Sequence, residues 1–307
     1  MIKVNHLYKS FEGFQVLNDV NMQVKKGSVY GLVGPNGAGK TTLIKTLTGV
    51  YRPDEGQVRI CDEAVFENNK IKEKFVHIPD DLYFYPMYST KQMANFYRDC
   101  YPTFSQERYE KIRSILRIDE KKRISKLSKG MKKQVAFWLA ISVKPEILIL
   151  DEPVDGLDPV MRRQIWSILM QDVAEREMTV LLSSHNLREL EDVCDYVGIL
   201  HEGKIVLERD LDQLKTDIHK VQCAFSEEMD RETFFIKNTE QAKSIQFLKK
   251  EKVGRVHTFI LKGQTAEIRE QMNLYHPLFL DFIPLTLEEI FIYELGGLGY
   301  ENENILL

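Results

Sequence analysis

Apolar residues at the start of the chain form strand-length runs that give way to helical spacing. Strands are expected at Ile2–Val4, at the alternating Val20–Val24 and at Val29–Val33, whose mostly apolar composition is typical of a buried strand. Thr42–Leu47 begins a helix, and Gly49 marks its end. The chain therefore opens with strands followed by a helix.

The pattern from about residue 88 to residue 142 is helical. The apolar positions of Thr90–Cys100 recur at helical spacing, and Ser105 is suited to cap a helix that starts at Gln106. A further helix opens near Ser128. We expect this stretch to form a helical insertion within the domain.

Strands alternate with helices again after the insertion. Ile147–Leu150, Thr179–Ser183 and Val197–Leu200 have strand length, and a helix with Pro159 near its first turn separates the first two. Alternating strands and helices predict an α/β fold with a mostly parallel core sheet.

The character of the chain changes near Asp210, where glycine becomes rare and Lys, Glu and Phe become frequent. Val256–Leu261 is typical of a strand and Leu287–Tyr293 of a helix. We therefore expect two domains: a main domain over residues 1–217 and a small α+β accessory domain over residues 218–307.

Composition excludes several classes of protein. The net charge of −4 and the pI near 6.0 give no general attraction to nucleic acid. Four cysteines without a CxxC pair argue against a disulfide framework or a zinc site and suit a reducing cytosol. The first ten residues lack the apolar region of a signal peptide, and no run reaches the ~20 apolar residues of a membrane helix. If the protein acts on a membrane, another chain must span it.

Three glycines interrupt the chain between the strand at Val29–Val33 and the following helix. Residues 34–41 read GPNGAGKT, which fits the phosphate-binding P-loop. Its backbone N–H groups and the helix N-terminus can bind α- and β-phosphates, Lys40 can reach the β- and γ-phosphates, and the Thr41 hydroxyl can bind Mg²⁺. A plain glycine turn is the alternative, but the strand–loop–helix context favours nucleotide binding. The residues assigned to the nucleotide are Gly34, Pro35, Asn36, Gly37, Ala38, Gly39, Lys40, Thr41 and Thr42.

Two acidic residues follow the buried strand Ile147–Leu150. Asp151 is a candidate Mg²⁺ ligand, and Glu152 is a candidate base for an attacking water. A solvated acidic turn would explain the pair by itself. With a P-loop upstream, phosphoryl transfer explains it better, because that reaction needs both a metal ligand and a water-orienting group.

Further motifs carry a family resemblance. Residues 151–159 read DEPVDGLDP and residues 179–185 read TVLLSSH. Together with the P-loop they resemble the nucleotide-binding domain of ABC transporter ATPases over about residues 1–210. The resemblance implies a P-loop NTPase fold with N-terminal antiparallel strands, ATP and Mg²⁺ as ligands, and catalytic roles for Lys40, Glu152 and His185, the last as the switch histidine that contacts the γ-phosphate.

The resemblance also assigns four residues outside the P-loop to nucleotide binding. Phe11 lies where the family places an aromatic ring that stacks on adenine, although an ordinary core Phe is an equally weighted interpretation. Ser128 and Gly130 match the signature segment, which meets the γ-phosphate bound by the opposite subunit. Asp158 matches a residue that communicates across the dimer.

Three positions depart from the family pattern. Lys129 and Met131 differ from the signature, although a helix N-terminus still offers N–H donors there. Asp80 stands where the family has a glutamine that touches Mg²⁺ and water. Asp80 is therefore either a metal ligand, as we expect, or part of a solvated acidic turn.

A signature that acts on the opposite subunit implies a dimer, either a homodimer or a heterodimer with a second ATP-binding subunit. Residues 82–88 read LYFYPMY and lie where relatives contact the cytoplasmic helices of an integral-membrane permease. Packing inside the helical insertion is an equally weighted alternative. The basic stretch at residues 121–133 is interpreted as a solvated helical face, with DNA binding or attraction of ATP as alternatives.

The single cassette, the degenerate signature, Asp80 and the C-terminal extension resemble the ATPases of bacterial multi-subunit exporters. We therefore expect an ATPase that powers a separately encoded permease from the cytoplasmic face of the membrane, with no nucleic-acid partner. The alternatives are a soluble ABC-type ATPase that acts on ribosomes or nucleic acid, and a regulatory sensor ATPase.

Overall fold

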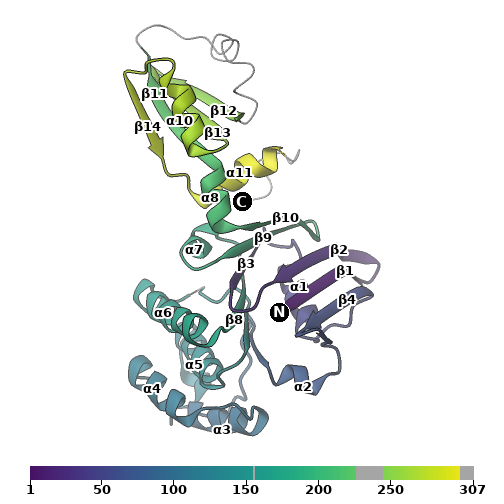
Figure 1. Cartoon of the computed structure of the whole chain (residues 1–307). Coiled ribbons are helices and arrows are strands. Elements are labelled where there is room, and N and C mark those ends of the chain that lie inside the picture. Colours follow the sequence, from purple (N-terminus) through teal and green to yellow (C-terminus); the bar gives the residue numbers. More distant parts are fainter. Residues whose placement is uncertain (155, 226–244, 298–307) are drawn as a thin grey trace. The chain divides into compact units, whose positions relative to one another are not determined.

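The computed structural model describes residues 1–154, 156–225 and 245–297 (Figure 1). The chain divides into two compact units, Met1–Glu208 and Arg209–Leu307. The first unit ends earlier than the residue 217 expected from the sequence, because helix α8 (Leu211–Asp217) contacts strand β11 (Ile218–Ala224) and helix α11 (Leu287–Gly297) of the second unit.

The first unit begins with a small antiparallel sheet in the order β2-β1-β4-β5. Strand β1 (Ile2–Phe11) pairs with β2 (Phe14–Val24) and with β4 (Glu55–Ile60), and β4 pairs with the short β5 (Glu63–Ala64). The sequence pattern predicts a strand only at Ile2–Val4, whereas strand β1 continues to Phe11. Register shifts after Val4 break the alternation of inward and outward side chains, so the rest of the strand cannot be recognised from the sequence pattern.

The core sheet of the first unit has the order β10-β9-β3-β8-β7-β6. Pairing is parallel from β9 (Tyr196–His201) through β3 (Val29–Val33), β8 (Thr179–Ser184) and β7 (Ile147–Leu150) to β6 (Phe75–Ile78). Strand β10 (Lys204–Asp210) follows β9 through a two-residue turn. The mostly parallel α/β architecture predicted from the sequence is confirmed.

Apolar burial joins the two sheets of the first unit. Helix α1 (Lys40–Leu47) contributes Leu43, Ile44 and Leu47, which share one core cluster with β1, β2, β4 and the core strands. The remaining helices outside the insertion are α2 (Asn69–Lys72), α6 (Pro159–Arg176) and α7 (Leu187–Glu191). Because α1 packs in one core with both sheets, the position of the P-loop before α1 is fixed by that packing.

Helices α3 (Thr90–Cys100), α4 (Gln106–Leu116) and α5 (Lys129–Ser142), with a 3₁₀ turn at Ile124–Lys126, form the helical insertion. Ser89 and Gln92 make a capping box at the start of α3, and Ser105 caps α4 as expected. The Trp138 ring stacks on the Tyr109 ring at 4.6 Å, and its Nε1 donates to the Tyr109 carbonyl oxygen at 2.9 Å. This contact fixes α4 against α5.

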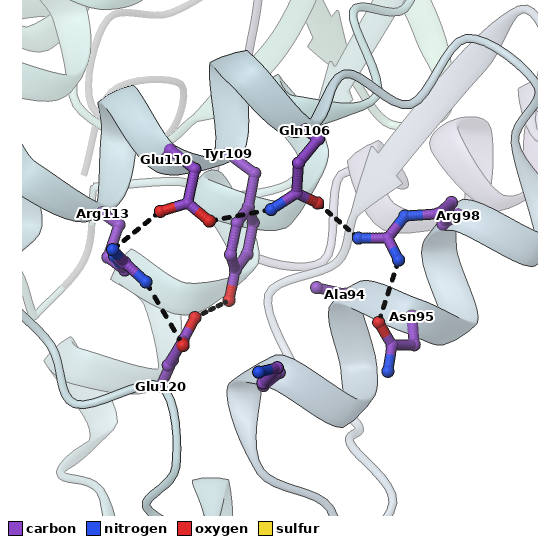
Figure 2. A pocket seen from close by; sticks show the side chains of 9 residues that line it. Ala94, Asn95, Arg98, Gln106, Tyr109, Glu110, Arg113 and Glu120 are labelled. Carbon is purple, nitrogen blue, oxygen red and sulfur yellow. Dashed lines mark hydrogen bonds and ion pairs between the residues drawn. The ribbon is translucent and has the colours of Figure 1, made fainter.

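A polar network crosses the surface between α3 and α4 and lines a cavity of about 420 Å³ (Figure 2). Glu110 accepts from Gln106 at 2.8 Å and pairs with Arg113 at 2.8 Å, while Arg113 and the Tyr109 hydroxyl reach Glu120 at 3.3 and 2.9 Å. Gln106 also accepts from Arg98 of α3. These polar groups satisfy one another across α3, α4 and Glu120.

The second unit contains a four-stranded antiparallel sheet in the order β12-β13-β11-β14. Its other strands are β12 (Gln246–Val253), β13 (Val256–Lys262) and β14 (Phe279–Ile283), and its helix α10 spans Thr265–Asn273. Ile268 and Met272 of α10 pack on the sheet in a core separate from that of the first unit. The expected strand at Val256–Leu261 and the expected helix at Leu287–Tyr293 are β13 and α11.

Strand β6 carries a half-buried histidine with a lowered pKa. His77 lies opposite Ile149 of β7, and burial lowers the pKa of its imidazole from 6.5 to about 4, while the charge of Asp151 acts in the opposite direction. The folded state therefore favours neutral His77, and the unfolded chain binds the proton more readily as the pH falls.

We predict that His77 contributes to acid destabilisation. Its share of the unfolding free energy is complete above about pH 6.5 and is lost between pH 6.5 and pH 4, by up to about 3 kcal/mol. Urea titrations without Mg²⁺ or nucleotide should show a shallower pH dependence for His77→Gln than for the wild type over this range. An identical slope for the two proteins would contradict the prediction.

Candidate functional site

The P-loop curls between β3 and α1, around the ammonium group of Lys40. Gly39, at the N-cap of α1, has a φ of 106°, which favours glycine. Lys40 is the first residue of α1 and is buried, and its Nζ donates to the carbonyl oxygens of Gly34 and Pro35 at 2.6 and 3.3 Å. The loop therefore has the strand–loop–helix geometry and the placed cation that phosphate binding needs.

Asp151 follows β7 and is buried, with 2% of its surface exposed. The Ser183 hydroxyl, from the neighbouring strand β8, donates to its Oδ1 at 2.6 Å. With this donor bound, the carboxylate keeps further acceptor sites, and Thr41 supplies a hydroxyl at the start of α1. Oxygen donors of this kind suit Mg²⁺, which typically takes one or two protein ligands together with substrate phosphates. The residues present therefore fit a magnesium ion.

Glu152 contacts residues from three segments that are distant in sequence, namely the P-loop helix, strand β8 and the residue after β8. Its Oε2 lies 2.9 Å from Nδ1 of His185, and its Oε1 lies 3.4 Å from Nζ of Lys40. Its backbone N–H donates to the Ser183 hydroxyl at 3.0 Å, and its φ of 46° is in the left-handed region. Three of the sequence-predicted catalytic residues, Lys40, Glu152 and His185, therefore meet at one point.

Among the described residues, the contact that links Asp80 to this centre is with a lysine, and 48% of the Asp80 side chain is exposed. Its Oδ1 lies 3.2 Å from Nζ of Lys133, which also donates to the backbone carbonyl oxygen of Glu152 at 2.8 Å. Lys133 belongs to α5 and is almost fully buried, although it lies in the basic stretch that the sequence assigned to a solvated face. That assignment is wrong for Lys133.

The signature segment forms the start of α5. Ser128 is exposed and caps the helix, accepting from the backbone N–H of Met131 at 3.2 Å. Gly130 packs against the loop before α6, since a Cβ there would lie 2.9 Å from the Gly156 carbonyl oxygen. Asp158 caps α6 through the N–H groups of Val160 and Met161 at 3.1 and 3.0 Å. Ser128 and Lys129, at the N-terminus of α5, are both exposed.

Phe11 ends β1 with 38% of its surface exposed, and its ring meets that of Tyr51 edge-on at 5.1 Å. It is therefore not the core phenylalanine that the sequence left as one interpretation. Its accessible ring remains a candidate for stacking on a base.

Sequence reasoning missed the parts played by Ser183 and Lys133. Ser183 was visible as a polar residue at the end of an apolar strand, where buried hydroxyl groups require partners. Lys133 lies three, four and seven positions before Ala136, Phe137 and Ala140, which face the core. Helical spacing therefore indicated its burial.

The fold and this arrangement of residues define a P-loop NTPase. Comparison with known proteins identifies the family within this class. The ABC transporter family matches residues 17–155. YtrB, an ABC transporter ATP-binding protein of Bacillus subtilis (strain 168), is 30% identical over 97% of this chain and 99% of its own length. The bacitracin transport ATP-binding protein BcrA of Bacillus licheniformis is 35% identical over 70% of this chain and 71% of its own. A solved ATP-binding subunit of an ABC transporter has a TM-score of 0.65 and 28% identity, covering 70% of this chain and 92% of that structure.

This chain therefore belongs to the ATP-binding proteins of ABC transporters, and its activity is ATP hydrolysis. The match to YtrB extends over both units, whereas the match to BcrA covers about as much of the chain as the first unit contains. Among the described residues, no helix is long and apolar enough to cross a membrane. The same residues contain no cluster of three or more His, Cys, Asp or Glu side chains that could hold a metal ion.

We predict that Ser183→Ala destabilises the fold. The substitution removes the donor to buried Asp151 and the acceptor for the Glu152 N–H, and the loss should lower the unfolding free energy by about 1–3 kcal/mol. Urea titration at pH 7 measures it. Ser114→Ala is the matched control, because Ser114 is exposed and its described hydrogen bond is to the Lys111 carbonyl oxygen of the same helix. Equal stability of the two variants would contradict the prediction.

Proposed function

We propose that this chain is the ATP-hydrolysing subunit of an exporter, in which two such subunits close over two ATP molecules and drive a separately encoded membrane permease. The observation that carries the proposal is the convergence of Lys40, Asp151, Glu152 and His185 at one edge of the core sheet. A phosphate-binding cation, a metal-binding carboxylate and an oriented base are the groups that phosphoryl transfer to water needs.

Each group has a distinct task in this proposal. Lys40 stabilises charge on the β- and γ-phosphates, and Asp151 and Thr41 hold Mg²⁺, which neutralises phosphate charge when bound. Glu152 accepts a proton from the attacking water, and His185 orients its carboxylate through the 2.9 Å contact. The accessible Phe11 ring stacks on adenine.

The exposed N-terminus of α5 supports the dimer. Ser128 and Gly130 lie on α5, whereas the P-loop precedes α1, so the signature segment is free to face a nucleotide held by a partner chain. Asp158, beside it at the start of α6, then lies at the same interface. Loss of the γ-phosphate releases the two halves, which is a ligand-driven rigid-body switch.

Names of relatives support export. BcrA is a bacitracin transport protein, SrtF of Streptococcus pyogenes is a lantibiotic transport protein, and LnrL of Bacillus subtilis is a linearmycin resistance protein. The proposed location is the cytoplasmic face of the membrane, where a permease supplies the transmembrane part and the contacts to the substrate.

An exposed aromatic patch supports a permease contact. Tyr83 and Met87 are exposed, with 77% and 62% of their surfaces accessible, and Tyr85 packs on Tyr88 at 4.9 Å and on Phe96 of α3 at 5.6 Å. Because the patch directly follows Asp80, a partner bound there would act close to the catalytic centre. We define this aromatic patch by Tyr83, Tyr85, Met87, Tyr88 and Phe96.

We predict that Glu152→Gln lowers the rate of ATP hydrolysis by about 10²–10⁴-fold, the usual contribution of a general base. The amide keeps the size of the side chain, so ATP should still hold the variant as a dimer. Phosphate release measures the rate, and light scattering with and without ATP measures the mass. A variant that hydrolyses ATP at the wild-type rate, or stays monomeric with ATP, would count against the proposal.

We predict that Tyr83→Ser with Tyr85→Ser weakens permease binding by at least about tenfold and leaves ATP hydrolysis by the isolated protein intact, because aromatic side chains dominate interfaces. The measurement is co-purification of tagged protein with membrane proteins from native membranes in detergent. Phe66→Ser, an exposed aromatic outside the patch, is the control. Unchanged recovery of a multi-span protein would remove the aromatic patch from the interface.

A further inference from the structure

Lys133 is the buried cation whose position the ATP-binding motifs do not explain. It has 2% of its surface exposed, and its Nζ makes two described contacts, to Asp80 Oδ1 at 3.2 Å and to the Glu152 carbonyl oxygen at 2.8 Å. A buried ammonium is costly unless it is paired and hydrogen-bonded. Asp80 and the Glu152 carbonyl oxygen therefore offset the cost of burying the Lys133 ammonium group.

The carbonyl that Lys133 holds belongs to a residue in a sparsely populated backbone conformation. Glu152 has a φ of 46°, and a non-glycine residue stays in this region only when its surroundings fix it. Ser183 holds the backbone N–H of Glu152, and Lys133 holds its carbonyl oxygen. Removing Lys133 frees one end of this constraint while leaving the side-chain contacts to Lys40 and His185 available.

The position of Lys133 on α5 gives the contact a second consequence. Ser128 caps the same helix five positions earlier, and Asp80 immediately precedes the segment that leads into the aromatic patch. One side chain thus joins the signature helix, the segment after β6 and the residue after β7. A displacement of either α5 or Asp80 would therefore change the hydrogen bond between Lys133 and the Glu152 carbonyl oxygen.

We propose that Lys133 is a positioning residue for ATP hydrolysis, which fixes the backbone of Glu152, and that Asp80 is its counter-ion and not a ligand of Mg²⁺. The inference rests on the proposed role of Glu152 as the base. It replaces the sequence-based expectation that Asp80 binds metal, since Oδ1 of this half-exposed side chain faces the Lys133 ammonium group.

Steady-state ATPase assays with a separate measurement of ATP affinity test the proposal. Lys133→Met should lower kcat by about 100-fold, the loss expected when a reacting group moves by about 1 Å, with less than about a threefold change in the Kd for ATP measured calorimetrically. Lys133→Arg should recover at least about a tenth of the wild-type kcat, because it restores the donors. Lys111→Met, on the exposed face of α4, is the control for loss of a lysine.

The variant Asp80→Asn distinguishes between two roles of Asp80, as the counter-ion of Lys133 or as a ligand of Mg²⁺. It should lower kcat by about tenfold, and the Mg²⁺ concentration for half-maximal activity and for tight ATP binding should stay within about twofold of the wild type. A tenfold higher Mg²⁺ requirement would identify Asp80 as a ligand and overturn this part of the proposal. If Lys133→Met does not fold, Asp80→Asn carries the test, and a wild-type kcat for it would overturn the inference.

The outcomes also separate this inference from the proposed function. A wild-type protein without ATPase activity would refute the assignment of the whole site, and the role of Lys133 with it. An active wild type with a kcat for Lys133→Met within about twofold would overturn the role of Lys133 alone. Equal losses of kcat and of ATP affinity would show a general structural effect and would also overturn it.

Discussion

Parallel pairing in the core sheet is the constraint on which the site depends. Strands β3, β8, β7 and β6 run in the same direction, with Val33 opposite Ser184 and Leu150 opposite both Leu182 and Ile78. All four strands therefore end at one edge. Residues scattered between positions 34 and 185 meet there because each follows the end of its strand.

That edge gathers several buried charges that must satisfy one another. Lys40 and Lys133 are buried cations, and Asp151 is a buried anion. Glu152 links them, through its carboxylate to Lys40 and through its backbone carbonyl to Lys133, while Ser183 joins Asp151 to the Glu152 N–H. Partial loss of such a network is costly, since a buried charge left without its partner keeps its desolvation penalty. The same network that satisfies the charges also orients the base.

The helical insertion and the second unit contribute in different ways. The insertion brings Lys133 to the site on α5 and presents the aromatic patch, and its helices are fixed by the Trp138–Tyr109 stack. The second unit has its own core beneath an antiparallel sheet. The full-length match to YtrB shows that this unit is shared with that relative and is not a peculiarity of this chain.

Local chemistry determined much of the site directly from the sequence. The P-loop and the acids after β7 were predicted because glycine spacing and strand ends are local signals. The role of His185 was implied by the family resemblance of residues 179–185. Strand β6 was not predicted, since four residues with a polar His77 give no periodicity. Only the tertiary structure decided which groups the Lys133 ammonium contacts, namely Asp80 and the backbone carbonyl oxygen of Glu152. Those contacts join residues far apart in the chain, and a local pattern carries no information about which distant charged groups will meet.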